Sequence, residues 1–158
     1  MQTVHHTMGV VVRKSFGVLI CALVASCGGS DTRTLTEKYE LQAQAEAWEN
    51  HMPMGLLPGQ EPPCTALIVR FSVTTNQVLP PEMSAKSVSL SKGAAPQWTA
   101  EVSPSETGLT GANTIEGVAR GCKTEAFSEG DTLDVSVLIN AGDEQSEVKT
   151  SVRLDAAS

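Results

Sequence analysis

Apolar and polar residues alternate along much of the chain after residue 65, with the two-residue period of half-buried β-strands. The clearest case is 66–74, in which Leu67, Val69 and Phe71 fall on one face. The same alternation recurs in segments 87–90, 97–102, 132–140 and 147–154. A further strand is expected at 114–121.

The apolar residues of the strand expected at 114–121 do not alternate regularly. Ile115 and Val118 can share a face only if the strand contains a bulge, and Gly117 stands where a bulge would form. We therefore predict a bulged strand here.

The segment before residue 50 carries two conflicting signals. Thr34 and Glu37 have the spacing of a helix capping box, whereas the residues from Tyr39 to Ala47 alternate like a strand. We favour a first strand over about 40–50 because the rest of the chain is β, and for 35–48 both helix and strand stay open.

Loops separate these segments. Four prolines between residues 51 and 64 exclude regular structure there, and 103–113 is polar with two glycines. About seven short strands, with no long helical segment after residue 50, predict an all-β domain built as a single antiparallel sandwich. Loops 51–64 and 103–113 are its expected contact surfaces, since loops on a rigid scaffold carry recognition.

The closing hairpin narrows the architecture. Gly130-Asp131 leads into a strand of alternating valines, and Gly142-Asp143 turns the chain into the last strand. This arrangement resembles the final two strands of immunoglobulin-like and fibronectin-like domains. The resemblance implies an immunoglobulin-like β-sandwich and says nothing about function.

An apolar run at 16–26 follows Arg13 and Lys14 and ends in small residues, as in a secretory signal peptide. The run is too short to cross a bilayer, which takes about 20 apolar residues. The signal could begin at Met1 or, more compactly, at Met8.

The residues Leu23-Val24-Ala25-Ser26-Cys27 resemble the lipobox of bacterial lipoproteins. The resemblance implies cleavage after residue 26, lipidation (palmitate) of Cys27 and anchoring in the cell envelope. Gly28, where an Asp would retain the protein at the inner membrane, implies the outer membrane. We therefore expect a signal peptide at 1–26, a lipidated Cys and polar tether at 27–38, and the β-sandwich domain at 39–158.

Charge narrows the set of partners. The predicted signal contains two of the 11 Lys and Arg residues and none of the 18 Asp and Glu, so the mature chain has a formal charge of −9. An acidic surface disfavours nucleic acid. The expected partners are the membrane, through the N-terminal lipid, and an envelope protein or ligand that the sequence does not identify.

The sequence lacks the residues and motifs that several common classes of enzyme need for catalysis. His5 and His6 lie in the predicted signal, which leaves His51 as the one histidine of the mature chain. No nucleophile elbow, phosphate-binding loop or dinucleotide fingerprint is present in the sequence. We expect no enzyme and no catalytic residue. An envelope hydrolase with paired carboxylates stays as an alternative.

One cluster could bind a metal. His51, Met52 and Met54 offer an imidazole and two thioethers, which are ligands suited to copper, and Met83 could add a third sulfur. The other interpretation is that the methionines pack over one end of the domain. We expect no cofactor, with a periplasmic copper-binding protein as the alternative function.

Two cysteines remain once Cys21 is removed with the signal and Cys27 is lipidated. In immunoglobulin-like topology the strands at 66–74 and 114–121 are antiparallel neighbours. Cys64 precedes the first and Cys122 follows the second, so the resemblance places both at the same edge. Exported proteins form disulfides, and we predict a Cys64–Cys122 bond. The function expected from the whole sequence is a non-catalytic binding or accessory module, anchored by lipid.

Overall fold

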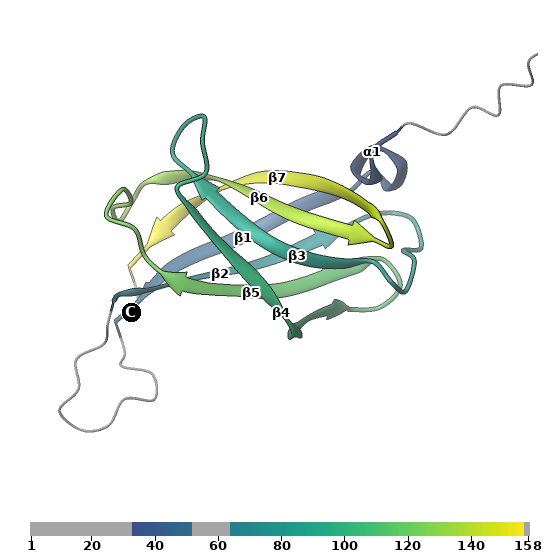
Figure 1. The fold of residues 1–158 in the computed structure, drawn as a ribbon, viewed down its shortest axis with the longest axis horizontal. Helices are drawn as coiled ribbons and strands as arrows, with labels where there is room; N and C mark the ends of the chain where they lie inside the picture. The colour runs from purple at the N-terminus through teal and green to yellow at the C-terminus, as the bar shows by residue number, and fades with distance from the viewer. Residues whose placement is uncertain (1–32, 52–63, 157–158) are drawn as a thin grey trace, which may run out of the picture. The chain divides into compact units, whose positions relative to one another are not determined.

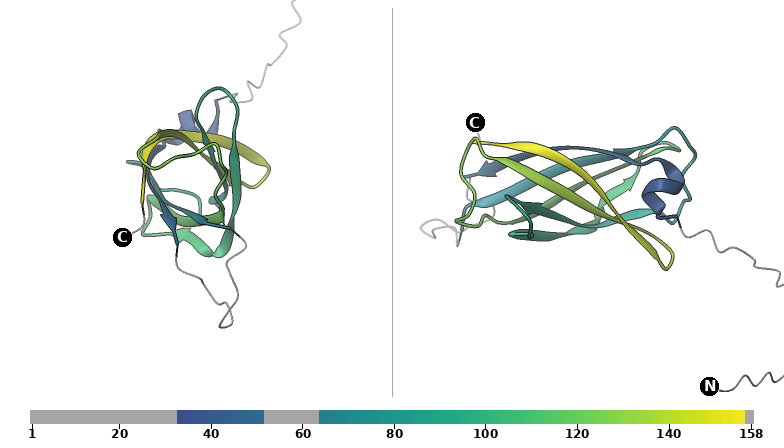
Figure 2. Two further views of the ribbon diagram at one scale, coloured as in Figure 1. Left: turned by 90° about the vertical axis from the view of Figure 1, so that its left-hand side faces the viewer. Right: turned by 90° about the horizontal axis from the view of Figure 1, so that it is seen from above.

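In the computed structural model, which describes residues 33–51 and 64–156, seven strands form one closed barrel with a short helix at one end (Figure 1). Seen along its long axis, the strands close a ring (Figure 2). The elements are α1 (Leu35–Tyr39), β1 (Gln42–Asn50), β2 (Ala66–Thr74), β3 (Ser84–Ser91), β4 (Trp98–Leu109), β5 (Thr114–Cys122), β6 (Thr132–Ala141) and β7 (Glu144–Asp155). The predicted all-β class and the seven strands are confirmed.

The strands follow one another around the barrel in the order β1-β2-β5-β4-β3-β6-β7. Neighbours are antiparallel except β1 and β7, which run parallel where Ala47 and Trp48 lie opposite Leu154 and Asp155. The orders β1-β2-β5-β4 and β3-β6-β7 are those of the two sheets in an immunoglobulin-type sandwich. The neighbours that the resemblance implied are therefore present.

The architecture differs from the predicted immunoglobulin-like sandwich because the two groups of strands are joined into a barrel. Residues 87–90 of β3 pair with 98–101 of β4 across a short turn, and the β1–β7 pairing closes the other seam. A strand with one buried face has the same alternating sequence in a sandwich and in a barrel. Periodicity alone could not separate the two.

The barrel interior is filled by the apolar face of every strand. In β6, the four residues at alternate positions from Leu133 to Ile139 are all at most 1 % exposed. In β2, Leu67, Val69, Phe71 and Val73 point inward in the same way, as predicted. Aliphatic side chains make up most of this core, with Phe71, Phe127 and Trp98 as its aromatic members.

Helix α1 resolves the ambiguity at 35–48, since both predicted elements are present in succession. Thr34 and Glu37 form the capping box, and Glu40 ends the helix in a left-handed conformation at φ 51°. Leu35 is 2 % exposed within the core, and the Thr36 hydroxyl lies 2.6 Å from that of Ser146 on β7. The folded domain therefore includes residues that the sequence assigned to the tether. No helix in the described ranges is long and apolar enough to cross a membrane.

The irregularity predicted in 114–121 lies instead in β4. Strand β5 pairs with β2 without a register shift over nine residue pairs, so the bulge expected at Gly117 is absent from it. Between Val102 and Thr107 the register of β4 shifts by several residues against β5. The prediction of a loop over 103–113 is correspondingly wrong, since β4 continues to Leu109.

A carboxylate fixes the turn that leads into β6. Asp131 accepts hydrogen bonds from Lys92 Nζ and from the Ser128 backbone N–H, each at 2.8 Å. The Lys92 hydrogen bond first, and that of Ser128 second, hold the pKa of Asp131 below its ordinary value of 3.8.

We expect this carboxylate to make stability depend on pH. Because its pKa is lowered in the folded state, its contribution is fully present above the unfolded-state value near 3.8 and is lost as the pH falls through the lower folded value. Asp131→Asn should lower the thermal midpoint at neutral pH, and the difference from wild type should shrink as the pH falls below 3.8. Asp134→Asn, at an exposed site on β6, is the matched control. A difference that stays constant from neutral to acidic pH would contradict this role.

Candidate functional site

An open groove of about 750 Å³ lies over β1, β2, β5 and the second half of β4. Its centre is a row of residues that stand side by side across the four strands: Ala45, Phe71, Gly117 and Thr107. All four residues occupy inward-facing positions of their strands, so the groove is lined by the backbone there and by the outward-facing residues on either side of the row. The volume is in the range of small-ligand sites.

The outward-facing side chains of the groove are mostly polar. Gln44 and Glu46 come from β1, Arg70 and Ser72 from β2, and Glu116 from β5. The irregular part of β4 adds Ser105 and Glu106, and Thr110 follows directly after the strand. The irregular stretch of β4 therefore forms one side of the groove.

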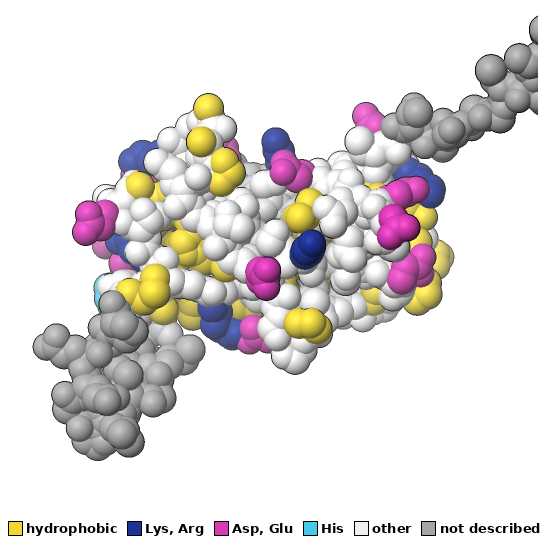
Figure 3. Space-filling model, in the orientation of Figure 1, with side chains coloured by type: hydrophobic (Ala, Val, Ile, Leu, Met, Phe, Trp, Pro, Cys, Tyr) yellow, Lys and Arg dark blue, Asp and Glu magenta, His cyan; other side chains and the backbone are white. Residues whose placement is uncertain are grey.

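One ion pair and one hydrogen bond involve carboxylates of the groove lining. Arg120 of β5 forms an ion pair with Glu106 of the β4 bulge, and the Thr110 hydroxyl donates to Glu116 Oε2 at 2.9 Å. Glu46 stands directly opposite Arg70 in the β1–β2 ladder. On the face shown in Figure 3, acidic and basic side chains are likewise scattered, and several stand next to one another. The groove therefore offers hydrogen-bonding groups, and its charged lining residues are three carboxylates (Glu46, Glu106 and Glu116) and one guanidinium (Arg70).

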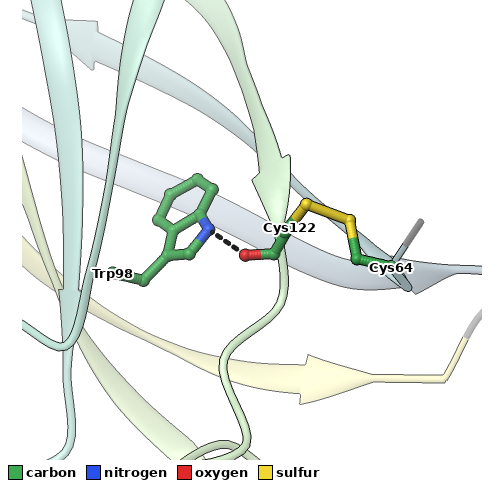
Figure 4. Close-up of a disulfide and its surroundings, with 3 residues drawn as sticks. All are labelled: Cys64, Trp98 and Cys122. Carbon is green, nitrogen blue, oxygen red and sulfur yellow. Dashed lines mark hydrogen bonds between the residues drawn. A yellow bond between two sulfur atoms is a disulfide. The ribbon is translucent and has the colours of Figure 1, made fainter.

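The opposite end of the same sheet holds the predicted disulfide. Cys64 and Cys122 are bonded, with Cα atoms 5.6 Å apart. Trp98 Nε1 donates to the Cys122 carbonyl at 3.0 Å, so the bridge is tied to β4 as well as to β2 (Figure 4). The sequence expectation that the start of β2 meets the end of β5 is confirmed, since Ala66 pairs with Cys122.

A buried carboxylate lies beside this disulfide. Glu49 points into the barrel end and is 6 % exposed. Lys123 Nζ lies 2.5 Å from its Oε1, and His51 Nε2 lies 3.5 Å from its Oε2. The nearby ammonium supplies the opposite charge that a carboxylate needs in such a position. We interpret this cluster as structural support for the barrel end.

Of the residues predicted as copper ligands, only His51 and the possible third sulfur, Met83, lie within the described residues. His51 is on the surface and is directed to Glu49. Met83 is buried in the core just before β3, at the opposite end of the barrel, so it cannot supply a third sulfur for a site at His51. Cys27, Met52 and Met54 lie outside the described residues. Within 33–51 and 64–156, no three His, Cys, Asp or Glu side chains are grouped to hold a metal ion.

Sequence reasoning missed the groove residues. Gln44, Arg70 and Glu116 are ordinary polar positions in the alternating pattern, and only the β1–β2–β5 ladder makes them neighbours. The segment 103–113 was singled out as a contact surface on the assumption that it is a loop. Residues 105–110 do line the groove, although 105–109 do so as part of β4.

Comparison of the chain with family models, with curated proteins and with solved structures gave no match.

Proposed function

We propose that this chain is a lipid-anchored lipoprotein of the cell envelope whose barrel domain acts as a non-catalytic binding module. The observation that carries the binding role is the groove of about 750 Å³ on the outer face of β1, β2, β5 and β4. Side chains fixed on a hydrogen-bonded sheet are preorganised, which lowers the entropic cost of binding. The strand order supports an immunoglobulin-like module in which the two sheets have joined.

Two features support the envelope location. The Cys64–Cys122 disulfide suits an oxidising compartment outside the cytoplasm. The residues before Cys27 resemble a lipobox, and Gly28 after it favours the outer membrane. Partners in this proposal are the bilayer, through the lipid, and an envelope ligand held in the groove.

Metabolic labelling tests the anchor. Expressed in a two-membrane bacterium, the full chain should incorporate radioactive palmitate and fractionate with the outer membrane. Cys27→Ala should abolish both, because the lipid has no other attachment point, whereas the control Cys21→Ala should label normally. Labelling of the Cys27→Ala protein would show that the lipid is attached elsewhere.

Photo-crosslinking tests the binding role. A diazirine amino acid at Gln44 in the groove should give a crosslinked species in living cells, since diazirines insert into whatever occupies the groove. The same amino acid at Ser151, which is exposed on β7, is the matched control. Identical products from the two positions, or none from Gln44, would contradict a binding role for the groove.

A further inference from the structure

The chemistry of the groove lining indicates the kind of ligand that fits it. Carboxylates accept hydrogen bonds, the Arg70 guanidinium donates them, and the hydroxyls of Ser72, Ser105 and Thr110 can do both. Apolar atoms of Val118 and Leu109 lie between these groups. A complementary ligand carries many donors and acceptors at short intervals, with small apolar faces between them.

The charge of the lining argues against an anion. Glu46, Glu106 and Glu116 all line the groove. Arg70 stands opposite Glu46, and the nearby Arg120 is already paired with Glu106. A phosphate or carboxylate ligand would therefore meet three acidic groups and one basic group in the lining. An uncharged ligand needs only hydrogen bonds.

The outer face beside the groove adds an aromatic surface. Trp48 follows Glu46 at the next outward position of β1 and is half-buried. The Arg70 guanidinium lies 5.9 Å from the centre of its ring system. An indole face packs well against C–H groups. Trp48 therefore extends the polar groove with a platform of the kind that suits the apolar face of a sugar ring.

An extended peptide suits this region less well. Strand β3 pairs only with residues 98–101 of β4. A peptide adding beyond them would need regular backbone donors, and the irregular stretch between Val102 and Thr107 contains Pro104, which has none. Bulges and prolines are devices that protect an edge against an added strand. The groove is thus better suited to a ligand that hydrogen-bonds to side chains than to one that pairs with the backbone.

We propose that the groove binds an uncharged oligosaccharide, with Arg70, Glu46 and Glu116 hydrogen-bonding to its hydroxyls and Trp48 packing beside it. The inference rests on the proposed binding function and names the class of ligand for it. Polyhydroxylated rings supply the dense mixture of donors and acceptors that the lining requires, without net charge.

Gly108 gives a direct way to block the groove. It lines the groove on β4 opposite the outward-facing Glu116, and a Cβ added there would meet no atom within 4 Å. Gly108→Tyr should therefore fold normally and fill the site. Ser151→Tyr on β7 is the matched control, and Arg70→Ala is a second test that removes a donor without adding bulk.

The experiment is calorimetric titration of the full chain, purified in a detergent without a sugar headgroup, with cellohexaose, chitohexaose and maltohexaose. At least one should bind with a dissociation constant of about 1 mM or tighter. Gly108→Tyr and Arg70→Ala should each weaken that binding by about tenfold or more, which corresponds to the loss of one good charged hydrogen bond. Ser151→Tyr should bind like wild type, and all variants should share its circular dichroism spectrum.

Three results would overturn the ligand class. These are binding of none of the three sugars, binding that Gly108→Tyr leaves unchanged, and tighter binding of the anionic oligogalacturonate than of any neutral sugar. If palmitate labelling and the Gln44 crosslink persist in such a case, the lipid-anchored binding module stands and the oligosaccharide is wrong. If the Gln44 crosslink is also missing, the binding role itself fails.

Discussion

Replacing both Cys64 and Cys122 by Ala is expected to lower the free energy of unfolding by about 4 kcal/mol. The two cysteines are 58 residues apart in the sequence, and a covalent link over that span removes much of the conformational entropy of the unfolded chain. Domains of this size are typically stable by about 5–15 kcal/mol. The loss is therefore a large share of the total, and the thermal midpoint should fall by roughly 15 °C.

Loss of the disulfide should lower the stability of the domain without changing its fold, because other contacts hold the same strands together. Strands β2 and β5 remain joined by nine residue pairs without the bridge. The Trp98 side chain still donates to the carbonyl of residue 122 because that acceptor belongs to the backbone. The double variant should thus give a β-rich circular dichroism spectrum like that of wild type and unfold at a lower denaturant concentration.

Reduction provides the control for this experiment. Wild-type protein unfolded in the presence of a reductant should have the same midpoint as the double variant, which itself should not respond to the reductant. Alkylation followed by mass spectrometry of the unfolded, unreduced wild type should find both cysteines protected. Equal midpoints for oxidised and reduced wild type would show that the bridge contributes nothing.

The sequence predicted the strands well because one face of each strand is buried. Segment 66–74 coincides with β2, and the predicted pairing of its neighbour at 114–121 is present, together with the disulfide that depended on it. The closure into a barrel was missed because burial of one face leaves the same pattern in either architecture. Helix α1 was recognised only as a capping signal, since five residues are too few to show a helical period.

The groove could not be predicted for a different reason. It depends on the bulge between Val102 and Thr107, where several residues of β4 lie opposite a single position of β5. The sequence there contains a proline and two serines, which is equally typical of a loop. A single sequence does not show which polar residues on separate strands will become neighbours. Sites formed by sheet register are therefore invisible until the pairing is known.

The second large effect is expected at Phe71, whose ring has small neighbours on both adjoining strands. It stands opposite Ala45 on β1 and Gly117 on β5, and it is 2 % exposed. Neither neighbour can move a side chain into the space that the ring occupies. Phe71→Ala should therefore leave a cavity and cost about 3–5 kcal/mol of stability, measured by denaturant unfolding.

Gly117, which lies opposite Phe71 on β5, allows a second test of this packing. A Cβ on Gly117 would lie 2.5 Å from Phe71 Cζ and 3.3 Å from the Glu106 carbonyl oxygen, so Gly117→Ala should cost about 1–3 kcal/mol by overpacking. Gly108→Ala, in the next residue pair of the same ladder, is the matched control, because its Cβ would meet nothing within 4 Å. Phe71→Leu should relieve the clash, so the double variant with Gly117→Ala should be destabilised by less than the sum of the two single changes. Strict additivity, or a Gly108→Ala cost equal to that of Gly117→Ala, would mean that backbone flexibility and not the Phe71 ring explains the glycine at 117.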